Sequence, residues 1–140
     1  GPGDPKECGP QIAETKRMYE SDIPIFAICL GHQLMALANG GDTYKLKNGH
    51  RGINHPGRDL ASNRVYITSQ NHGYVVDADT IDPKIADISF VSMNDGSVEG
   101  LTYKTGRAFS VQFHPEACGG PLDTRFLFDR FIDVMGGARL

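Results

Sequence analysis

A short apolar run followed at once by a helix-forming segment is the feature that most restricts how this chain can fold. Residues 23–29 read IPIFAIC and contain no charged side chain. A continuous run of this length is typical of a strand buried on both faces of a parallel sheet. Residues 32–39, HQLMALAN, contain good helix formers and are followed by Gly40 and Gly41, which favour a helix end there. The two segments together predict a strand, a tight turn and a helix.

The rest of the chain predicts two more helices and several strands. We expect helices over residues 11–19 and 122–135. The apolar face of the second is expected to contain Leu122, Phe126, Phe131, Ile132 and Met135. Stretches rich in β-branched and aromatic residues predict strands at residues 64–69, 73–76, 87–93, 97–103 and 108–113. Residues 94–96, Asn-Asp-Gly, are typical of a hairpin turn.

Length and element order indicate one α/β unit. The chain has 140 residues, of which 39% are hydrophobic, and this is enough for an ordinary core. The order of helices and strands predicts the α/β class with an antiparallel insertion or edge. A doubly wound sheet has several strongly apolar strands, but only one such run is present. We therefore expect residues 1–140 to be the C-terminal part of a longer subunit.

Charge and cysteine content argue against several classes of protein. The 14 basic and 17 acidic residues are interspersed, so we expect neither a nucleic-acid partner nor a membrane-surface partner. The longest apolar stretch is much shorter than the roughly 20 residues that span a bilayer. The three cysteines, Cys8, Cys29 and Cys118, form no CxxC pair, which argues against a disulfide framework or a structural zinc site. We expect a reducing, cytoplasmic setting.

Cys29 lies where the predicted strand turns into the predicted helix. A nucleophile elbow requires small residues two positions before and two after the nucleophile, and Ala27 and Gly31 meet this requirement. A helix N-terminus also favours the thiolate over the thiol. The alternative is a structural role, because free cysteines are among the most buried residue types. The residues alone leave both interpretations open.

A thiol nucleophile requires a base, and histidine is the usual one. The candidates are His32, His50, His55, His72 and His114. His114 directly follows the predicted strand 108–113, at the sheet edge where α/β sites form, and Glu116 is close enough to orient its ring. The alternative is that His114 and Glu116 belong to a solvated strand exit. His32 is expected to point away from any substrate.

Two loops are further candidates for a site. Residues 1–3, Gly-Pro-Gly, could present amide N–H groups to an anion. Residues 70–74, QNHGY, could hold a polar substrate, although an ordinary turn is the alternative. A metal site made of His50, His55 and His72 has no recognised ligand spacing, so we predict that the chain binds no metal.

Four segments in succession resemble the class I (triad) glutamine amidotransferases. They are GPGDP at 1–5, FAICLGHQ at 26–33, QNHGY at 70–74 and SVQFHPEA at 110–117. Within this family the likeness is greatest to the small, glutamine-hydrolysing subunits of carbamoyl-phosphate synthetases, because of NGHRGINHP at 48–56 and GGPLDTRFLFDRF at 119–131. The resemblance implies a flavodoxin-like doubly wound sheet with a small antiparallel edge that lacks its N-terminal strands. Sister amidotransferases that serve anthranilate, GMP or CTP synthesis share the cysteine and His-Pro-Glu motifs.

The resemblance also implies roles for individual residues. Cys29 would attack the side-chain amide of glutamine, His114 would protonate the departing ammonia, and Glu116 would orient His114. Backbone N–H groups of Gly3 and Leu30 would form the oxyanion hole. The positions that match the family's glutamine contacts are Gly1, Gly3, Leu30, Gln33, Asn71, Gly73 and Tyr74.

The resemblance further implies a partner. Ammonia would pass to a large ATP-using synthetase subunit, which would bind ATP and Mg, and this chain is expected to need no cofactor. Ala27 stands where the family usually has glycine, and Cys118-Gly119 stands where Ser-Pro is common. The alternatives are an amidotransferase that serves another synthetase, or a non-catalytic fragment that only binds a partner.

Overall fold

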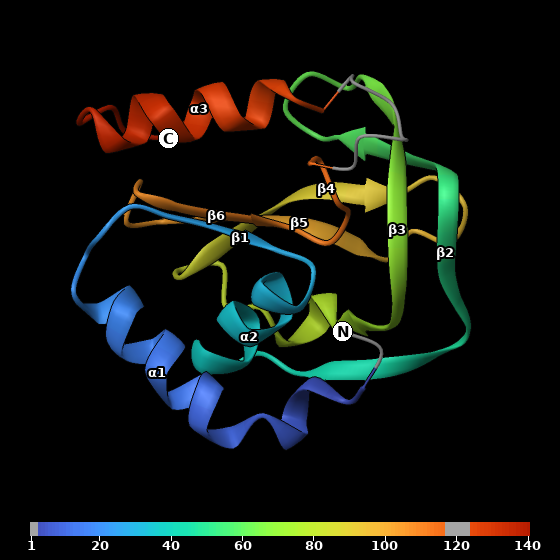
Figure 1. Ribbon diagram of the computed structural model, residues 1–140, viewed down its shortest axis with the longest axis horizontal. Helices are drawn as coiled ribbons and strands as arrows, with labels where there is room; N and C mark the ends of the chain where they lie inside the picture. Colours follow the sequence, from blue (N-terminus) through green and yellow to red (C-terminus); the bar gives the residue numbers. More distant parts are fainter. Residues whose placement is uncertain (1–2, 117–123) are drawn as a thin grey trace.

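A mixed sheet with helices on both faces forms the protein, as seen in a computed structural model that describes residues 3–116 and 124–140 (Figure 1). The helices are η1 (Pro5–Glu7), α1 (Gly9–Glu20), α2 (Leu30–Ala38), η2 (Ala78–Thr80) and α3 (Phe126–Met135). The strands are β1 (Ile25–Ile28), β2 (Thr43–Asp59), β3 (Val65–Val76), β4 (Ala86–Ser92), β5 (Val98–Tyr103) and β6 (Ala108–Val111). Helices α1 and α2 cover one face of the sheet, and α3 covers the other.

The strand order in the described sheet is β1-β6-β5-β4-β2-β3. Strands β1 and β6 are parallel, with Ile25 opposite Ala108 and Ile28 opposite Val111. The other neighbouring strands pair antiparallel. The predicted α/β class with an antiparallel part is therefore confirmed, and the hairpin predicted at residues 94–96 joins β4 to β5. Gly96 has a φ of +73° in this turn, a value that favours glycine.

The long β2–β3 ribbon is the main difference from the predicted elements. The sequence predicts no strand over β2, because most of its residues are polar or glycine. Strand β3 is one continuous strand, whereas the sequence predicts two, at 64–69 and 73–76. The intervening residues stay in the strand because residues 70–72 pair with residues 50–52 of β2, between two register shifts. Pairing across the sheet therefore prevails over the turn character of the QNHGY segment.

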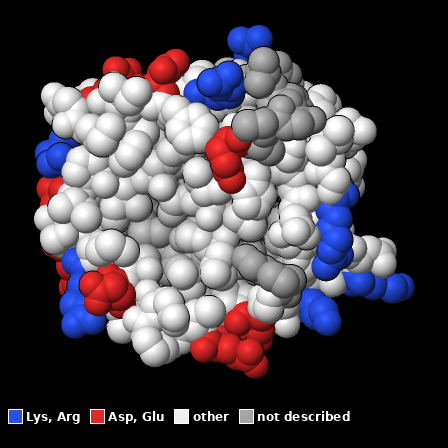
Figure 2. Space-filling view, in the orientation of Figure 1, with Lys and Arg blue, Asp and Glu red and all other residues white. Residues whose placement is uncertain are grey.

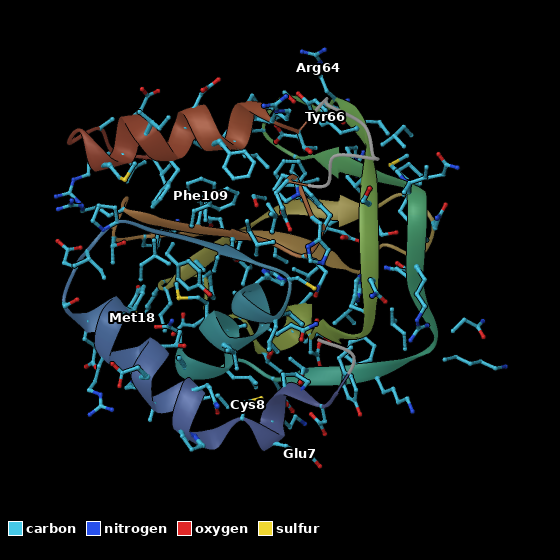
Figure 3. The ribbon with its side chains drawn as sticks, viewed as in Figure 1. Glu7, Cys8, Met18, Arg64, Tyr66 and Phe109 are labelled. Atoms are coloured by element: carbon cyan, nitrogen blue, oxygen red, sulfur yellow. The ribbon has the colours of Figure 1, made fainter. Side chains whose placement is uncertain are left out.

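Two apolar clusters hold the helices against the sheet. On one face Ala27 of β1 and Met35 of α2 are in the same buried cluster. On the other face the ring of Phe109 stacks on Phe26 at 4.5 Å between ring centres and lies 6.4 Å from Phe131 of α3. Figure 3 shows Phe109 in the layer between the sheet and α3. Because β1 and β6 are packed on both faces, their carboxyl ends are firmly positioned.

Helix α3 buries part of the predicted face, because Phe126 and Phe131 pack against the core. Leu127 and Val134 are 0% and 1% exposed, whereas Ile132 and Met135 are 58% and 54% exposed. Leu127, Phe131 and Val134 are spaced by four and three residues, so they share one face of the helix. Ile132 lies five residues after Leu127 and therefore faces away from the sheet. The prediction for Ile132 and Met135 is wrong, and Leu122 lies outside the described residues.

Charged side chains lie mainly around the rim of the face shown in Figure 2, and its centre is largely uncharged. Within residues 3–116 and 124–140, none of the helices combines the length and apolarity needed to cross a bilayer.

Substituting alanine for Gly100 is expected to destabilise the sheet by about 2 kcal/mol, because overpacking a tight core site costs ~1–3 kcal/mol. A Cβ atom at Gly100 would lie 2.7 Å from Ser89 Oγ and 3.0 Å from both Phe90 Cδ2 and the Ser110 carbonyl oxygen. Urea unfolding measures the change. Gly9→Ala is the control, since a methyl group at Gly9 would meet no atom within 4 Å beyond its chain neighbours and the nearby backbone of its own helix. Equal stability of the two variants would contradict the close approach.

Candidate active site

Cys29 has the backbone conformation of a nucleophile elbow. Its φ and ψ are 53° and −107°, directly between β1 and α2. The other non-glycine residues with positive φ in the described chain are Asp22 and Asn63, types that tolerate this region, whereas cysteine does not favour it. A Cβ atom at Gly31 would lie 3.4 Å from Ala27 Cβ, so larger side chains at these two positions would crowd the turn. Such strain is typical of functional positions.

The thiol of Cys29 is buried and faces hydrogen-bonding groups. Cys29 is 4% exposed, and its Sγ lies 3.6 Å from Gln112 Nε2 and 3.9 Å from the Asn71 carbonyl oxygen. Burial raises the pKa of the thiol, while hydrogen bonds from the Leu30 N–H and from Gln112 lower it. The net direction is upward, opposite to the effect expected from the helix N-terminus alone. The resting thiol therefore needs a base to remove its proton.

His114 and Glu116 form the expected pair. His114 Nδ1 lies 2.6 Å from Glu116 Oε1. Because a carboxylate only accepts hydrogen bonds, Nδ1 must carry the proton, and Nε2 is then the ring nitrogen that can accept one. The backbone N–H of His114 donates to the Ser69 carbonyl oxygen at 2.8 Å.

The fold brings Cys29 and His114 to one edge of the sheet. They follow the carboxyl ends of β1 and β6, which are neighbouring parallel strands. Strand β3 contacts both, through the carbonyl of Asn71 to the thiol and the carbonyl of Ser69 to the His114 N–H. The carboxyl ends of parallel strands are where α/β sheets bind ligands. This arrangement suits nucleophilic attack with proton transfer.

The predicted oxyanion donors lie beside one pocket. Gly3 and Leu30 both line a pocket of about 310 Å³, together with Asp4, Glu7 and Cys8. Figure 3 shows Cys8 near the start of α1, on the layer beneath the sheet. Cys8 and Cys29 are both free thiols. Gly1 and Cys118 lie outside the described residues.

The other predicted substrate residues differ in exposure. Asn71 is exposed, Tyr74 is half-buried and Gly73 is buried. Gln33 is only 1% exposed, and its Nε2 donates to the Tyr74 carbonyl oxygen at 2.8 Å and to Gln112 Oε1 at 3.0 Å. Gln33 therefore lies beneath the thiol and not on the outer surface of α2.

Sequence reasoning missed Gln112. It is 0% exposed and contacts the thiol directly. One feature of the sequence could have identified Gln112: it lies two residues before His114, in a segment that ends at the site. His32 is buried against β6, with Nδ1 2.7 Å from Ser110 Oγ, so its ring is turned into the fold. Burial lowers the pKa of His32 to about 3, and its ring is therefore neutral.

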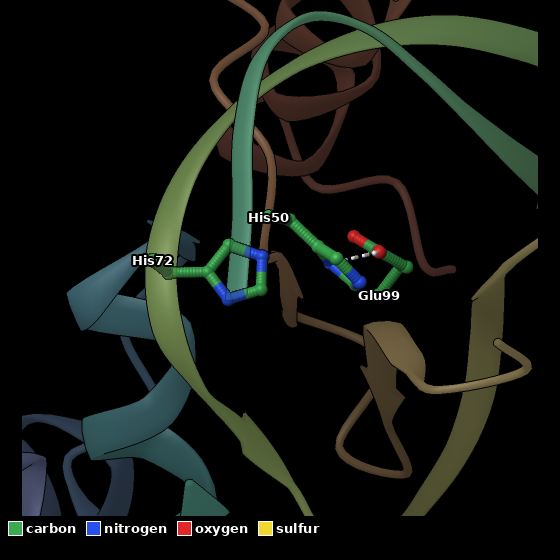
Figure 4. A group of neighbouring side chains, drawn as sticks. All are labelled: His50, His72 and Glu99. Carbon is green, nitrogen blue, oxygen red and sulfur yellow. Dashed lines mark ion pairs between the residues drawn. The ribbon is translucent and has the colours of Figure 1, made fainter. Parts of the chain in front are cut away.

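A second polar cluster joins His72 of the 70–74 segment to His50 and Glu99 (Figure 4). His50 Nε2 lies 2.7 Å from Asp95 Oδ2, and His50 Nδ1 lies 3.5 Å from Glu99 Oε1. These partners, Glu99 above all, raise the pKa of His50 to about 9. The ring of His72 is close by, and burial lowers its pKa to about 4. Gln70 Oε1 joins the two rings, at 3.1 Å from His50 Nδ1 and 2.7 Å from His72 Nε2.

Among the described residues, this cluster groups side chains of the types that bind metal ions. The ligand atoms of His50, His72 and Glu99 lie within 4.8 Å of one another. His55, the third histidine considered above, instead bonds to the Arg51 carbonyl oxygen at 2.8 Å. A histidine whose pKa is about 9 is protonated at neutral pH, so a metal would have to displace that proton in order to bind. We therefore interpret the cluster as an ion-pair network, and the absence of a metal stays a prediction.

Stability is expected to depend on this network at both ends of the pH range. The pKa of His50 is raised to about 9, so its contribution is complete below about 6.5 and is lost as the pH rises through 9. Burial raises the pKa of Asp95, but hydrogen bonds from Ser97 and His50 outweigh it and lower the value to about 2. Its contribution is lost as the pH falls from about 4 towards 2.

A His50→Asn variant should test the alkaline limb. We expect it to be less stable than the native protein by about 2 kcal/mol at pH 7, since hydrogen bonds to charged groups contribute ~1.5–3 kcal/mol. The difference should shrink as the pH rises from about 6.5 through 9. Urea unfolding at several pH values measures it, with His55→Asn as the control. A constant difference across this range would show that His50 is not charged in the fold.

Comparisons with known proteins agree with this geometry. Residues 1–134 match the family model described as "Glutamine amidotransferase class-I". The carbamoyl phosphate synthase pyrimidine-specific small chain of Lactiplantibacillus plantarum is 54% identical over 135 residues, which cover 96% of this chain and 37% of the relative. The carbamoyl phosphate synthase small chain of Clostridium perfringens is 56% identical over 132 residues, covering 94% and 37%. The chain thus spans little more than a third of these relatives.

Solved structures show the same fold at low sequence identity. A crystal structure from Thermoplasma acidophilum, described as a GMP synthase component, has a TM-score of 0.78 at 22% identity and covers 97% of this chain and 69% of that one. A glutamine amidotransferase from Thermotoga maritima has a TM-score of 0.63 at 24% identity, with coverage of 90% and 54%.

Proposed function

This chain belongs to the class I glutamine amidotransferase family, and we propose that it hydrolyses the side-chain amide of glutamine to supply ammonia to a carbamoyl-phosphate synthetase. The observation that carries the proposal is that the strained Cys29 elbow and the His114–Glu116 pair follow the carboxyl ends of two neighbouring parallel strands. The names of relatives more than 50% identical to this chain support the choice of synthetase.

The proposed reaction begins with proton transfer from Cys29 to His114 Nε2. The sulfur attacks the amide carbon, and a tetrahedral oxyanion forms that the N–H groups of Gly3 and Leu30 stabilise. The protonated His114 gives its proton to the amide nitrogen, the C–N bond breaks, and ammonia leaves a thioester on Cys29. His114 then removes a proton from water, whose oxygen attacks the thioester. The C–S bond breaks, and glutamate is released as the thiol is restored.

Glu116 supports this cycle through the His114 ring. Its contact with Nδ1 keeps the tautomer in which Nε2 faces the reaction, and it stabilises the imidazolium that forms in each half-cycle. Nearly half of the Glu116 side chain is exposed, so solvent screens part of this stabilisation. Glu116 is therefore proposed as an orienting residue and not as a proton carrier.

The proposed glutamine contacts are Gly1, Gly3, Leu30, Gln33, Asn71, Gly73 and Tyr74. Support comes from the pocket that Gly3 and Leu30 share and from the Asn71 carbonyl beside the thiol. Gln33 is buried, so its proposed contact with bound glutamine would be made from the inner side of the Cys29 elbow. We further propose that the ammonia is used by a large synthetase subunit, which binds ATP and Mg, and that both subunits are cytoplasmic.

Covalent labelling of the complete subunit, with its large partner present, tests the proposal. A chloroketone analogue of glutamine should alkylate Cys29, and excess glutamine should slow the labelling. Peptide mass spectrometry identifies the labelled residue, and ammonia release from glutamine is measured on the same sample. Cys8, a free thiol at the start of α1, is the internal control. Labelling of Cys8 at the same rate as Cys29, or no protection by glutamine, would refute the assigned nucleophile.

A further inference from the structure

Gln112 is fully buried and is held by three groups around it. Its Nε2 lies 3.6 Å from Cys29 Sγ, and its Oε1 accepts a hydrogen bond from Gln33 Nε2 at 3.0 Å. Its backbone N–H donates to the Glu99 carbonyl oxygen at 2.7 Å. A buried amide is costly unless its polar atoms are satisfied, and a leucine or methionine would fill the same space without this cost. The presence of an amide here therefore needs a reason beyond packing.

The neighbouring groups fix which end of the Gln112 amide faces the thiol. The Tyr74 carbonyl can only accept, so the Gln33 atom that contacts it, at 2.8 Å, must be the NH₂ group. That same NH₂ group contacts Gln112, which must therefore offer its oxygen to Gln33. The NH₂ group of Gln112 is left to point at Cys29 Sγ. The backbone carbonyl of Tyr74 thus fixes the direction of both amide hydrogen bonds, from Gln33 to Gln112 and from Gln112 to the thiol. Neither amide can be turned over without placing two acceptors or two donors against each other.

We infer that Gln112 is a catalytic residue that donates a hydrogen bond to the Cys29 thiolate, and that Gln33 is the positioning residue that keeps its donor end towards the sulfur. The inference rests on the proposed role of Cys29 as the nucleophile. An amide N–H stabilises a thiolate without competing with His114 for the proton, because the amide does not titrate. Burial disfavours the thiolate at this site and raises the pKa of Cys29, whereas the hydrogen bonds from the Leu30 N–H and from Gln112 are among the interactions that lower it.

The test measures the reactivity of Cys29 directly, in the complete subunit. Iodoacetamide alkylation of the Cys29 peptide is followed by mass spectrometry from pH 6 to about 10, because only the thiolate reacts. In Gln112→Met we expect the apparent pKa of Cys29 to rise by about one unit and alkylation at pH 7 to slow about tenfold. Gln112→Glu should slow it further, since a carboxylate beside the thiolate repels it.

Two further variants separate positioning from packing. Gln33→Leu should shift the profile in the same direction by about threefold, because the Gln112 amide can then turn away from the sulfur. Gln11→Glu, which makes the same substitution as Gln112→Glu at an exposed position of α1, should leave the profile unchanged. If Gln112→Met does not fold, Gln33→Leu decides the matter, because it keeps the Gln112 side chain and changes only the group that orients its amide.

If folded Gln112→Met has the same alkylation profile as the native protein, the inference is overturned. If Gln112→Met does not fold, the same result in Gln33→Leu overturns it. The proposed function would stand in that case, provided that the glutamine analogue still labels Cys29. Failure of the analogue to label Cys29 in the native protein would instead refute the proposed function.

Discussion

Replacing Cys29 by serine is expected to lower the rate of glutamine hydrolysis by about 10⁴-fold or more, the loss typical when the nucleophile of a catalytic triad is removed. A hydroxyl loses its proton far less readily than a thiol, and burial of the Cys29 position makes an anion there costlier still. Oxygen and sulfur side chains are similar in size, so the elbow and the pairing of β1 with β6 should persist. Ammonia release at saturating glutamine measures the effect.

The control for this experiment is Met18→Leu. Met18 is an exposed residue of α1 and lies on the lower layer (Figure 3). Its replacement should leave the rate within about twofold of the native value, as for most substitutions outside a reaction centre. Substantial activity in Cys29→Ser, with the thermal unfolding midpoint unchanged, would show that another group attacks the amide.

Replacing His114 by asparagine is expected to lower the turnover rate by about 10³-fold, within the ~10²–10⁴-fold range of general acid–base catalysis. The substitution removes the ring nitrogen that we propose accepts the thiol proton and then gives it to the departing amide nitrogen. It keeps the backbone N–H that donates to the Ser69 carbonyl oxygen at 2.8 Å, so the exit from β6 should be preserved. KM for glutamine should change little, since His114 is assigned no contact with bound substrate.

His55→Asn is the control for this variant. Within the described residues, the His55 ring hydrogen-bonds to the Arg51 carbonyl oxygen and to no group near Cys29. Glu116→Gln should give an intermediate loss of about 10–100-fold, smaller than in a buried triad because its carboxylate is partly exposed. A His114→Asn variant that keeps a tenth of the native turnover would exclude His114 as the base.

The strand, elbow and helix around Cys29 were predictable because their signals are local. An apolar run, two small residues and a glycine-terminated helix specify a strand-turn-helix unit without any distant contact. The position of His114 was also predictable, since a residue that follows a buried strand must lie at the sheet edge. The resemblance to class I amidotransferases was needed to bring Gly3, Leu30 and Asn71 into the same site.

Features that depend on tertiary pairing could not be predicted in this way. Strand β2 is polar along much of its length and forms because β3 and β4 offer it hydrogen-bonding partners. Gln112 and Glu99 are fully buried although their residue types are usually exposed. Only the three-dimensional contacts with Cys29 and His50 show why these polar side chains lie inside. The upward shift of the Cys29 pKa likewise depends on burial that the sequence does not display.

Strand β3 has a consequence for how such a site could be regulated. Within a few residues its backbone contacts the thiol through Asn71, the His114 N–H through Ser69 and the Gln33 amide through Tyr74. A rigid shift of this strand would change the nucleophile, the base and the amide chain together. A displacement of β3 would therefore be expected to change the surroundings of the Cys29 thiol, the position of His114 and the orientation of the Gln33 amide at the same time.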